Sequence, residues 1–229
     1  MDDVNGVNGG DGVNGGDDMS DVFDGAGFKD IPPTTLADVL GHEQVMDIGV
    51  RPLWPSMPRV AGPAFTVRCP PGDNLMLHAA IYRAEPGSVI VVDTGGDVDY
   101  AVAGGNVCAV AQRRGVAAFV VDGVIRDLAE VREMGFPVFA RGVIPIPGVK
   151  AAVEPLGGQV LCGGVRVNAG DVVVADEEGI VVAPHARLQQ VLLDARTRLA
   201  KESAESLDAW QTAHHARITA LLNPQPPTN

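Results

Sequence analysis

Two short apolar runs, at positions 88–93 and 117–122, stand out in the hydrophobic pattern of the chain. A run that is apolar at nearly every position is typical of a strand whose two faces are both covered, as in parallel sheets. Around these runs, apolar residues recur at the spacing of amphipathic helices. Strands separated by helices of this length predict an α/β fold with a parallel or mixed sheet.

The same pattern assigns an element to most of the chain. The expected helices are residues 35–45, a helix opened by Asp73-Asn74 and ended by Pro86-Gly87, residues 100–114, residues 127–134, and a long terminal helix from residue 184 to about residue 222. The expected strands are residues 65–67 after a turn at Gly62-Pro63-Ala64, residues 88–93, 117–122 and 136–140, and β-rich segments at 159–167 and 171–183. The β-rich segments predict an added β-layer, and sites are expected where loops gather at the carboxyl ends of strands.

Length and composition predict a single globular domain. With 229 residues, of which 46% are hydrophobic, the chain can bury one core and needs no second. We expect this domain over residues 21–223, including the helical extension. Residues 1–20 are rich in Gly, Asn and Asp without hydrophobic periodicity and predict a disordered leader, and residues 224–229 predict a flexible tail.

Charge and cysteine content argue against several classes of function. A formal net charge of -12 disfavours nucleic acid as a direct partner, because nucleic-acid binding draws on clustered Lys and Arg. The three cysteines are far apart and lack C-x-x-C spacing, so they predict reduced core thiols. No apolar run is long enough to cross a bilayer and no signal-peptide pattern is present, which favours a cytoplasmic protein with no membrane partner.

Arg126 and Asp127 directly follow the second apolar strand and its glycine turn, and they are the main candidates for chemistry. Arg offers a rigid cationic fork that matches a carboxylate, and Asp is a hard oxygen ligand for Mg²⁺ or Mn²⁺. A structural alternative carries similar weight from these residues alone. Asp127 followed three positions later by Glu130 is also the pattern of a helix N-cap with its capping-box partner.

Several further motifs occur in collinear order between Asp38 and Val182. They are Gly62-Pro63-Ala64-Phe65-Thr66-Val67, Gly72-Asp73-Asn74, residues 86–93, Arg114-Gly115-Val116-Ala117, residues 121–127, residues 136–142, Ala169-Gly170-Asp171 and residues 176–182. An ordered series is far more specific than any one motif. In this series the chain resembles the RraA-like family, which includes the 4-hydroxy-4-methyl-2-oxoglutarate aldolases and the regulators of ribonuclease E activity.

The resemblance implies both a fold and an activity. The fold would be an αββα-type sandwich of the swivelling β/β/α kind, with a mixed sheet, a β-rich layer and a long C-terminal helix, assembled as a trimer or hexamer. The activity would be that of a class II lyase, dependent on Mg²⁺ or Mn²⁺, that cleaves a 2-oxo dicarboxylic acid (4-hydroxy-4-methyl-2-oxoglutarate or oxaloacetate) to pyruvate through an enolate. The alternative is a non-catalytic regulator that binds ribonuclease E or a related RNA-degradation enzyme.

The resemblance also implies roles for particular residues. Arg126 would bind the substrate carboxylate and Asp127 would hold the metal. The start of the preceding helix, Gly104-Gly105-Asn106-Val107, would offer backbone N–H groups to the pyruvyl moiety, which agrees with the general use of helix N-termini as anion sites. A turn or tight packing explains the two glycines equally well.

Two features qualify this implied site. The family aldolases carry an acidic residue and then Leu where this chain has Gly105 and Asn106, so a carboxylate expected near the metal is missing from that position. Glu202, from the C-terminal helix of a neighbouring subunit, is the candidate for a second carboxylate, although a Glu on such a helix is more often solvated or paired at i,i+4. The five histidines show no ligand spacing: His42, His78, His185, His214 and His215.

Overall fold

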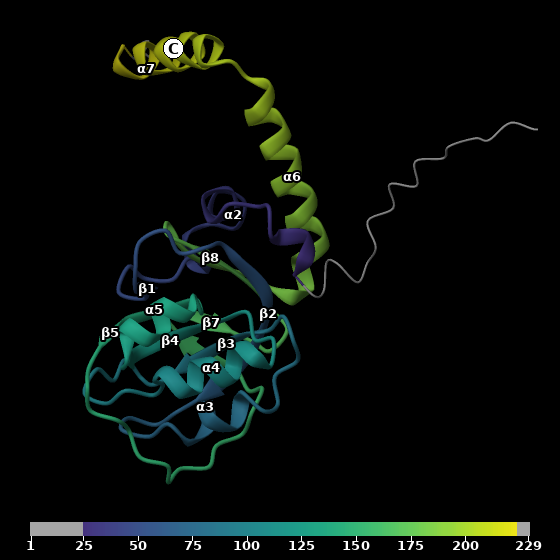
Figure 1. The fold of residues 1–229 in the computed structure, drawn as a ribbon. Helices are drawn as coiled ribbons and strands as arrows, with labels where there is room; N and C mark the ends of the chain where they lie inside the picture. Colours follow the sequence, from purple (N-terminus) through teal and green to yellow (C-terminus); the bar gives the residue numbers. More distant parts are fainter. Residues whose placement is uncertain (1–24, 224–229) are drawn as a thin grey trace, which may run out of the picture.

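A seven-stranded mixed sheet forms the framework of the computed structural model, which describes residues 25–223 (Figure 1). The order of its strands is β1-β5-β4-β3-β2-β8-β9. The strands are β1 (Arg51–Pro52), β2 (Val60–Arg68), β3 (Val89–Asp93), β4 (Ala118–Ile125), β5 (Val138–Val143), β8 (Val172–Asp176) and β9 (Gly179–Ala183), and a separate hairpin joins β6 (Val160–Cys162) to β7 (Val165–Val167). The expectations for residues 1–20 and 224–229 lie outside the described residues.

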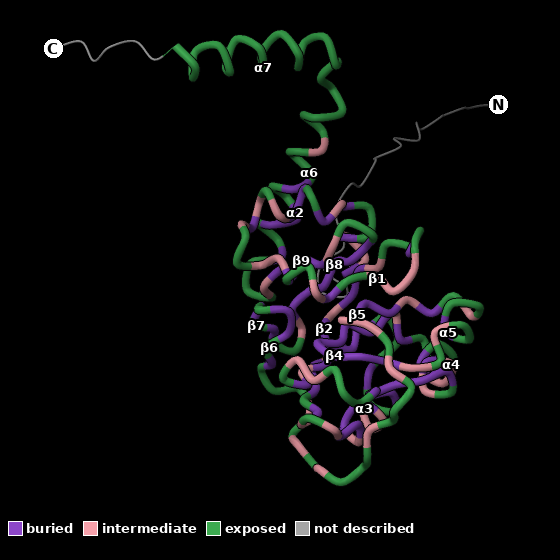
Figure 2. The backbone as a smooth tube through the Cα atoms, turned by 90° about the vertical axis from the view of Figure 1, so that its left-hand side faces the viewer, coloured by how far each residue is buried: buried purple, intermediate pink, exposed green. Residues whose placement is uncertain are grey.

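The centre of the sheet is parallel and its two ends are antiparallel. Strands β2, β3, β4 and β5 pair in parallel, whereas β1 joins β5, β8 joins β2 and β9 joins β8 in antiparallel register. Every residue of β4 is buried, which explains why its sequence is apolar at nearly every position. Figure 2 shows that buried residues gather in these central strands.

Helices and the hairpin cover the sheet in layers. The helices are α2 (Pro33–Leu40), α3 (Leu75–Ala80), α4 (Gly105–Arg113), α5 (Leu128–Met134), α6 (Leu188–Ala204) and α7 (Leu207–Leu222), with short 3-10 helices η1 (Ala26–Phe28), η2 (His42–Gln44) and η3 (His185–Arg187). Helices α3, α4 and α5 pack on one face of the parallel strands, and the β6–β7 hairpin packs on the other face. Helices α2 and α6 cover β8 and β9. The predicted α/β sandwich with a mixed sheet and a β-rich layer is confirmed.

The turn predicted at Gly62-Pro63-Ala64 is wrong, because these residues lie inside β2. Residues 60–63 pair with β8, and from Ala64 onward the strand pairs with β3. Pro63 lies where β2 changes partners, which is a position where a strand tolerates the loss of a backbone N–H. Gly62 is required by space, since a side chain there would collide with the carbonyl oxygen of Gly87.

Four predicted helix boundaries also differ. The helix expected to end at Pro86-Gly87 ends at Ala80. The helix expected over residues 35–45 ends at Leu40, where Gly41 adopts φ 90°. The helix expected over residues 100–114 begins only at Gly105, because the residues before it run extended beside the end of β4. The long terminal helix is interrupted after Ala204, and Ser206 starts α7 by accepting a hydrogen bond from the N–H of Ala209 at 3.2 Å.

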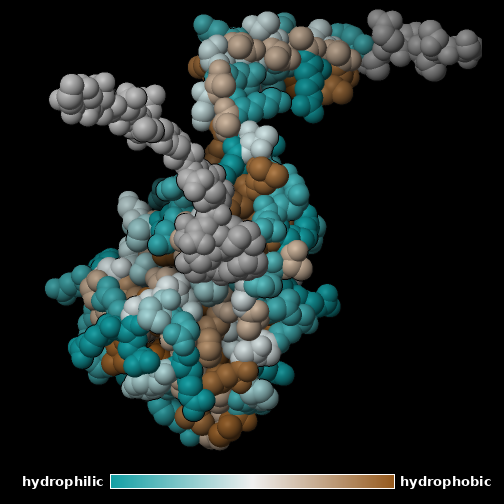
Figure 3. All heavy atoms as spheres, turned by 90° about the vertical axis from the view of Figure 1, so that its right-hand side faces the viewer, coloured by the Kyte–Doolittle hydropathy of each residue, from teal (hydrophilic) through white to brown (hydrophobic). Residues whose placement is uncertain are grey.

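The C-terminal arm formed by α6 and α7 extends away from the sheet, as Figure 1 shows. Every residue of α7 is exposed. Figure 3 shows apolar side chains on the surface of this arm, and the large exposed ones on α7 are Leu207, Trp210, Ile218, Leu221 and Leu222. None of the helices within residues 25–223 combines the length and the apolar character that crossing a membrane requires.

A buried carboxylate connects the sheet to the hairpin that covers it. Asp122 in β4 is only 6% exposed. Its Oδ1 accepts a hydrogen bond from Nε of Arg141 in β5, and its Oδ2 accepts one from the N–H of Gly163, between β6 and β7, at 3.0 Å. Arg141 also contacts Asp47. Loss of this carboxylate would leave the guanidinium and the Gly163 N–H without their partner.

We therefore expect Asp122→Ala to lower the free energy of unfolding by about 3 kcal/mol, the cost of removing one partner of a buried ion pair. The matched control is Arg198→Ala, which removes the exposed ion pairs of Arg198 with Asp38 and Glu202 and is expected to cost less than about 1 kcal/mol. Urea unfolding followed by circular dichroism measures both values. Equal losses for the two variants would contradict the role given to Asp122.

Candidate functional site

Asp127, between β4 and α5, has an unusual backbone conformation. Its φ and ψ are 58° and 38°, and Ser56 is the other non-glycine residue with positive φ within the described part of the chain. A left-handed residue that is not glycine costs about 1 kcal/mol and persists where its surroundings hold it in place. Glycine would adopt this backbone conformation without strain. The chain has Asp at this position instead, so it keeps a carboxylate here at the cost of that strain.

The side chain of Asp127 points toward α4. Its Oδ2 accepts a hydrogen bond from the N–H of Gly105 at 3.0 Å, and it makes no side-chain cap to α5, the helix that it precedes. The capping-box alternative for Asp127 and Glu130 is therefore wrong. Asp127 instead satisfies one of the free N–H groups at the start of another helix, where negative charge is also favoured by the helix dipole.

Two backbone hydrogen bonds hold the extended segment before α4 against the end of β4. The N–H of Val102 donates to the carbonyl oxygen of Val124 at 3.0 Å, and the N–H of Arg126 donates to the carbonyl oxygen of Ala103 at 2.9 Å. Gly104 is thereby pressed against Arg126 and Asp127. Its backbone is extended, with φ −151°, so glycine is needed here for space: a side chain would collide with Asp127 Oδ2 and approach Arg126 Nε to 3.1 Å.

The start of α4 presents two backbone N–H groups that are free to bind a ligand. The N–H of Gly105 is taken by Asp127, and within residues 25–223 the N–H groups of Asn106 and Val107 have no acceptor. Helix N-termini with unpaired N–H groups bind anions, and glycine lets a ligand approach the backbone closely. Of the four residues predicted from the sequence to form this cradle, Asn106 and Val107 keep donors available for a ligand.

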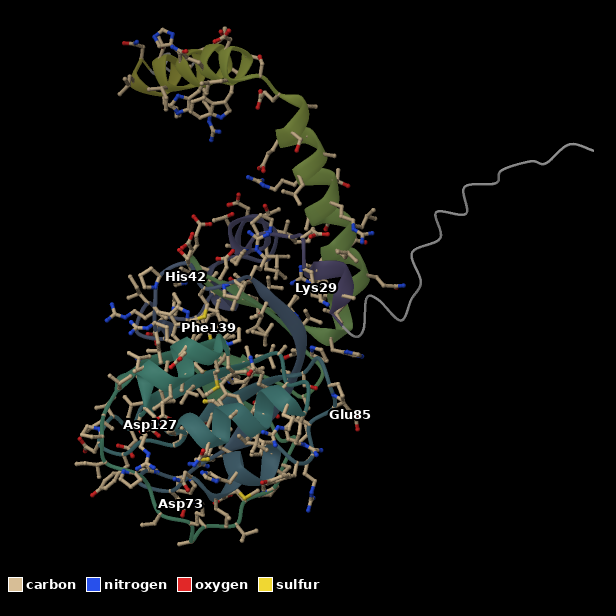
Figure 4. The ribbon with its side chains drawn as sticks, viewed as in Figure 1. Lys29, His42, Asp73, Glu85, Asp127 and Phe139 are labelled. Atoms are coloured by element: carbon tan, nitrogen blue, oxygen red, sulfur yellow. The ribbon has the colours of Figure 1, made fainter. Side chains whose placement is uncertain are left out.

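A cavity of about 90 Å³ brings these groups together. One wall consists of residues 101–104 with Asn106, Val107, Arg126 and Asp127. The other lining residues are Asn74, His78, Pro147 and Lys150. Arg126 Nε lies 3.4 Å from Asp127 Oδ2, and the two side chains are 42% and 35% exposed, so both can reach a ligand. In Figure 4, Asp127 and Asp73 lie at the end of the molecule remote from the C-terminal arm.

Glu130 is the residue that sequence reasoning missed. A Cβ placed on Gly105 would fall on the carboxylate of Glu130, so this side chain fills the space that a residue at position 105 would otherwise occupy. A carboxylate from α5 therefore lies beside the first turn of α4. The signal was present in the sequence, because Glu130 follows Asp127 by three positions, but it was assigned to a capping box.

The oxygen donors at this site fit a hard divalent cation. Within residues 25–223, Asp127 Oδ1 accepts no hydrogen bond, so it is available to a cation. Glu130 places a second carboxylate beside Gly105, the residue that donates to Asp127. Within that same range, no cluster of three or more His, Cys, Asp or Glu residues is arranged to hold a metal. Mg²⁺ is commonly bound through one or two carboxylates with water completing its shell, so this donor set is sufficient.

Cys108 lies behind the site on α4 and is fully buried. Burial and, to a smaller extent, the negative charge of Asp127 together raise the pKa of its thiol to about 12. Burial likewise raises the pKa of Cys69, to about 11. A thiol with so high a pKa is a poor nucleophile. The prediction of buried, unpaired cysteines is confirmed for all three, including Cys162.

Glu202 does not meet the cavity within a single chain. It lies on α6, where its Oε1 is 2.9 Å from Nε of Arg198, and its side chain is 51% exposed. This is the i,i+4 pairing that the sequence left open as an alternative. A role in the cavity of a neighbouring subunit concerns an assembly, and it stays a prediction.

Comparison with known proteins places this cavity in a family. A sequence model of the RraA-like family, described as Aldolase/RraA, matches residues 19–182. That range contains every residue that lines the cavity and ends before α6. A protein of Halalkalibacterium halodurans named "Putative 4-hydroxy-4-methyl-2-oxoglutarate aldolase" is 37% identical over 177 residues, which cover 77% of this chain and 84% of that protein.

Solved structures share the fold. RraAS2 of Streptomyces coelicolor, described as an unusual member of the RNase ES inhibitor RraA protein family, superposes with a TM-score of 0.71 at 29% identity, covering 81% of this chain and 95% of that one. RraA of Thermus thermophilis, described as an RNA-processing inhibitor, superposes with a TM-score of 0.61 at 28% identity, covering 67% and 92%.

The close approach of Gly104 to Asp127 can be tested by substitution. We expect Gly104→Ala to displace the carboxylate and weaken binding of Mn²⁺ by about tenfold or more, as measured by isothermal titration calorimetry. Gly158→Ala is the matched control, because Gly158 has ordinary backbone angles and open space around it. Unchanged Mn²⁺ affinity in Gly104→Ala would show that Asp127 does not bind the cation.

Proposed function

The chain belongs to the RraA-like family, and from this premise we propose that it is a divalent-metal-dependent carbon–carbon lyase. Its substrate would be a 2-oxo dicarboxylic acid, 4-hydroxy-4-methyl-2-oxoglutarate or oxaloacetate, and its product pyruvate. The observation that carries the proposal is the meeting of Arg126, Asp127 and the free N–H groups of α4 in one cavity. A cation, a metal-binding carboxylate and an anion cradle are what a 2-oxo acid requires.

Asp127 would hold Mg²⁺ or Mn²⁺, with Glu130 beside it. When bound, such an ion acts as a Lewis acid that stabilises the negative charge of an enolate. The left-handed backbone of Asp127 and its hydrogen bond from Gly105 fix the direction of the carboxylate before any ligand arrives. This preorganisation lowers the cost of assembling the site.

Arg126 and the start of α4 would bind the pyruvyl end of the substrate. The guanidinium of Arg126 matches the C1 carboxylate in geometry and offsets its charge. The N–H groups of Asn106 and Val107 would donate to the oxygens of the same group, and the backbone of Gly104 and Gly105 lets the substrate lie close. Held in this way, the bond to be broken keeps a fixed orientation throughout the reaction.

Glu130 is the residue proposed to move protons. In aldol cleavage the C4 hydroxyl loses its proton as the C3–C4 bond breaks, the bonding electrons pass into the enolate of pyruvate, and C3 then takes up a proton. Glu130 contacts Gly105, next to the cavity lining, so its carboxylate would exchange these protons through an intervening water. Decarboxylation of oxaloacetate removes no hydroxyl proton and depends less on this residue.

Self-association as a trimer or hexamer belongs to the same proposal. The α6–α7 arm exposes large apolar side chains that no other part of residues 25–223 covers. A neighbouring subunit is the proposed partner of this arm, and it would bring Glu202 toward the cavity of the adjacent copy. No nucleic acid or membrane is needed for the proposed reaction.

A second candidate function is regulation of ribonuclease E or a related RNA-degradation enzyme by protein binding. It is supported by the similarity to one structure described as an RNA-processing inhibitor and to another described as an unusual member of the RNase ES inhibitor RraA protein family. Recovery of an RNA-degradation enzyme with the purified protein, together with its inhibition in a reconstituted assay, would support it. A pull-down that recovers no such enzyme would count against it.

The enzymatic proposal is tested by pyruvate release from the two named substrates. We expect activity with Mg²⁺ or Mn²⁺ that is abolished by EDTA, and a loss of about 100-fold or more in kcat/KM for Arg126→Ala and Asp127→Ala. Arg132→Ala, on the exposed surface of α5, is the control and should remain active. Activity that survives EDTA and is inactivated by borohydride would instead indicate a Schiff base on a lysine and overturn the metal-dependent mechanism.

The role of Glu130 is tested separately. We expect Glu130→Gln to reduce aldol cleavage by about 100-fold and oxaloacetate decarboxylation much less, because only the first reaction transfers a hydroxyl proton. Glu133→Gln, on the same helix, is the control. The double variant Gly105→Asp with Glu130→Ala returns a carboxylate to the same space and is expected to recover aldol activity. Equal losses for both substrates would contradict the assignment.

A further inference from the structure

We propose that Thr94 is a positioning residue whose hydroxyl fixes a β-bulge in β4, and that this bulge sets the register in which Arg126 and Asp127 reach the cavity. The inference rests on the proposed function and extends it to a buried residue outside the cavity lining. Its basis is an extra residue in β4, shortly before Arg126, with a buried hydroxyl bonded to the backbone at that point.

The register between β4 and β5 changes within β4. Before the change Val121 pairs with Ala140, and after it Val124 pairs with Gly142. Two residues of β4, at positions 122–123, therefore lie opposite one residue of β5, which makes this a β-bulge. Bulges next to active sites commonly change the direction of the side chains that follow them.

The extra residue decides which side chains arrive at the end of β4. In the observed register Ile125 pairs with Val143. If the register continued without the bulge, Val124 would take that place and every later residue would move on by one position. Ile125 would then occupy the place of Arg126, and Arg126 that of Asp127. The bulge is therefore what brings the cation and the carboxylate to the positions at which they line the cavity.

Thr94, the first residue after β3, holds the bulge with its hydroxyl. The residue is 2% exposed, and its Oγ1 donates a hydrogen bond to the carbonyl oxygen of Asp122 at 2.5 Å. The same oxygen accepts a hydrogen bond from the N–H of Asp97 at 3.1 Å. A hydroxyl has one proton to donate, so the donor of Thr94 is used on the bulge and an acceptor site is used on its own loop.

Gly123 leaves room for that hydroxyl. A Cβ at position 123 would lie 2.6 Å from Thr94 Oγ1 and 3.0 Å from the carbonyl oxygen of Asp97. Thr94 does not move aside easily, because β-branched side chains are stiff at χ1 and its hydroxyl is bonded on two sides. A change at either Gly123 or Thr94 therefore disturbs the same hydrogen bond.

The loop after β3 is itself held in place. Asp97 Oδ2 accepts a hydrogen bond from the N–H of Gly72 at 2.7 Å, and its Oδ1 accepts one from the N–H of Asp99 at 2.9 Å. These bonds join the loop after β3 to the loop before α3. Thr94 thus links the bulge to a braced part of the chain, and its hydroxyl acts as a fixed support for β4.

The alignment is tested without any ligand by the amide proton chemical shift of Gly105, which depends on the hydrogen bond to Asp127 Oδ2. Thr94→Val keeps the shape of the side chain and removes the hydroxyl. In this variant we expect the NMR signal of the Gly105 N–H to move upfield, toward its position in Asp127→Ala. Thr94→Ser keeps the hydroxyl and should leave the signal close to its wild-type position.

Thr66→Val is the matched control for Thr94→Val. Thr66 is also fully buried, and its Oγ1 donates to the carbonyl oxygen of Gly158 at 2.6 Å, so the change removes the same kind of hydrogen bond. Thermal melting should show a loss of stability in both Val variants, whereas the Gly105 signal should move only in Thr94→Val.

The affinity for Mn²⁺, measured by isothermal titration calorimetry with the metal alone, should follow the same order. We expect binding about tenfold weaker in Thr94→Val, and weaker by less than about twofold in Thr94→Ser and Thr66→Val.

Gly123→Ala provides a second route if Thr94→Val does not fold, because the added methyl presses on the hydroxyl without removing it. It is expected to move the Gly105 signal in the same direction. Gly142→Ala is its control, since a Cβ at that position of β5 would meet Val124 at 3.9 Å, an ordinary contact.

The outcomes separate this inference from the proposed function. A wild-type protein that binds no Mn²⁺ would reject the metal-dependent proposal, while the Gly105 signal would still decide on Thr94. Metal binding by the wild type, with signal and affinity unchanged in Thr94→Val and Gly123→Ala, would reject the role of Thr94 alone. Equal changes in Thr94→Val and Thr66→Val, or in Thr94→Val and Thr94→Ser, would overturn it as well.

Discussion

The hydrogen bond from the N–H of Gly105 to Asp127 Oδ2 is the contact on which the site depends. It joins the start of α4 to the end of β4, and it turns the carboxylate away from α5 into the cavity. The left-handed backbone of Asp127 is tolerated because this bond, together with the extended segment ending at Gly104, leaves the side chain one direction to take. Strain at a single residue thus maintains the alignment of a charged pair with a helix N-terminus.

A glycine and a glutamate at the site act as a pair. Gly105 removes a side chain from the first turn of α4, and Glu130 fills the space from α5 with a carboxylate. A carboxylate therefore lies next to the first turn of α4 although none is present in that turn.

The strands and the location of the site could be predicted from the sequence, because a buried parallel strand is apolar throughout and loops gather at its carboxyl end. Helix boundaries next to the site could not. Residues 100–104 have the composition of a helix, but they run extended because hydrogen bonds to β4 and to the loop after β5 outweigh local preference. The partners of Asp127, Glu130 and Asn74 all lie more than 20 residues away in the sequence or on another helix, so no local pattern reveals them.

The cavity also shows how binding capacity is kept in a well-packed protein. Its lining comes from separate stretches of chain: the start of α4, the end of β4, α3 and the loop after β5. Within residues 25–223, the N–H groups of Asn106 and Val107 and the side-chain Oδ1 of Asn74 have no hydrogen-bond partner. Unpaired groups held rigidly cost stability in the free protein. A ligand that pairs with such groups recovers part of that cost when it binds.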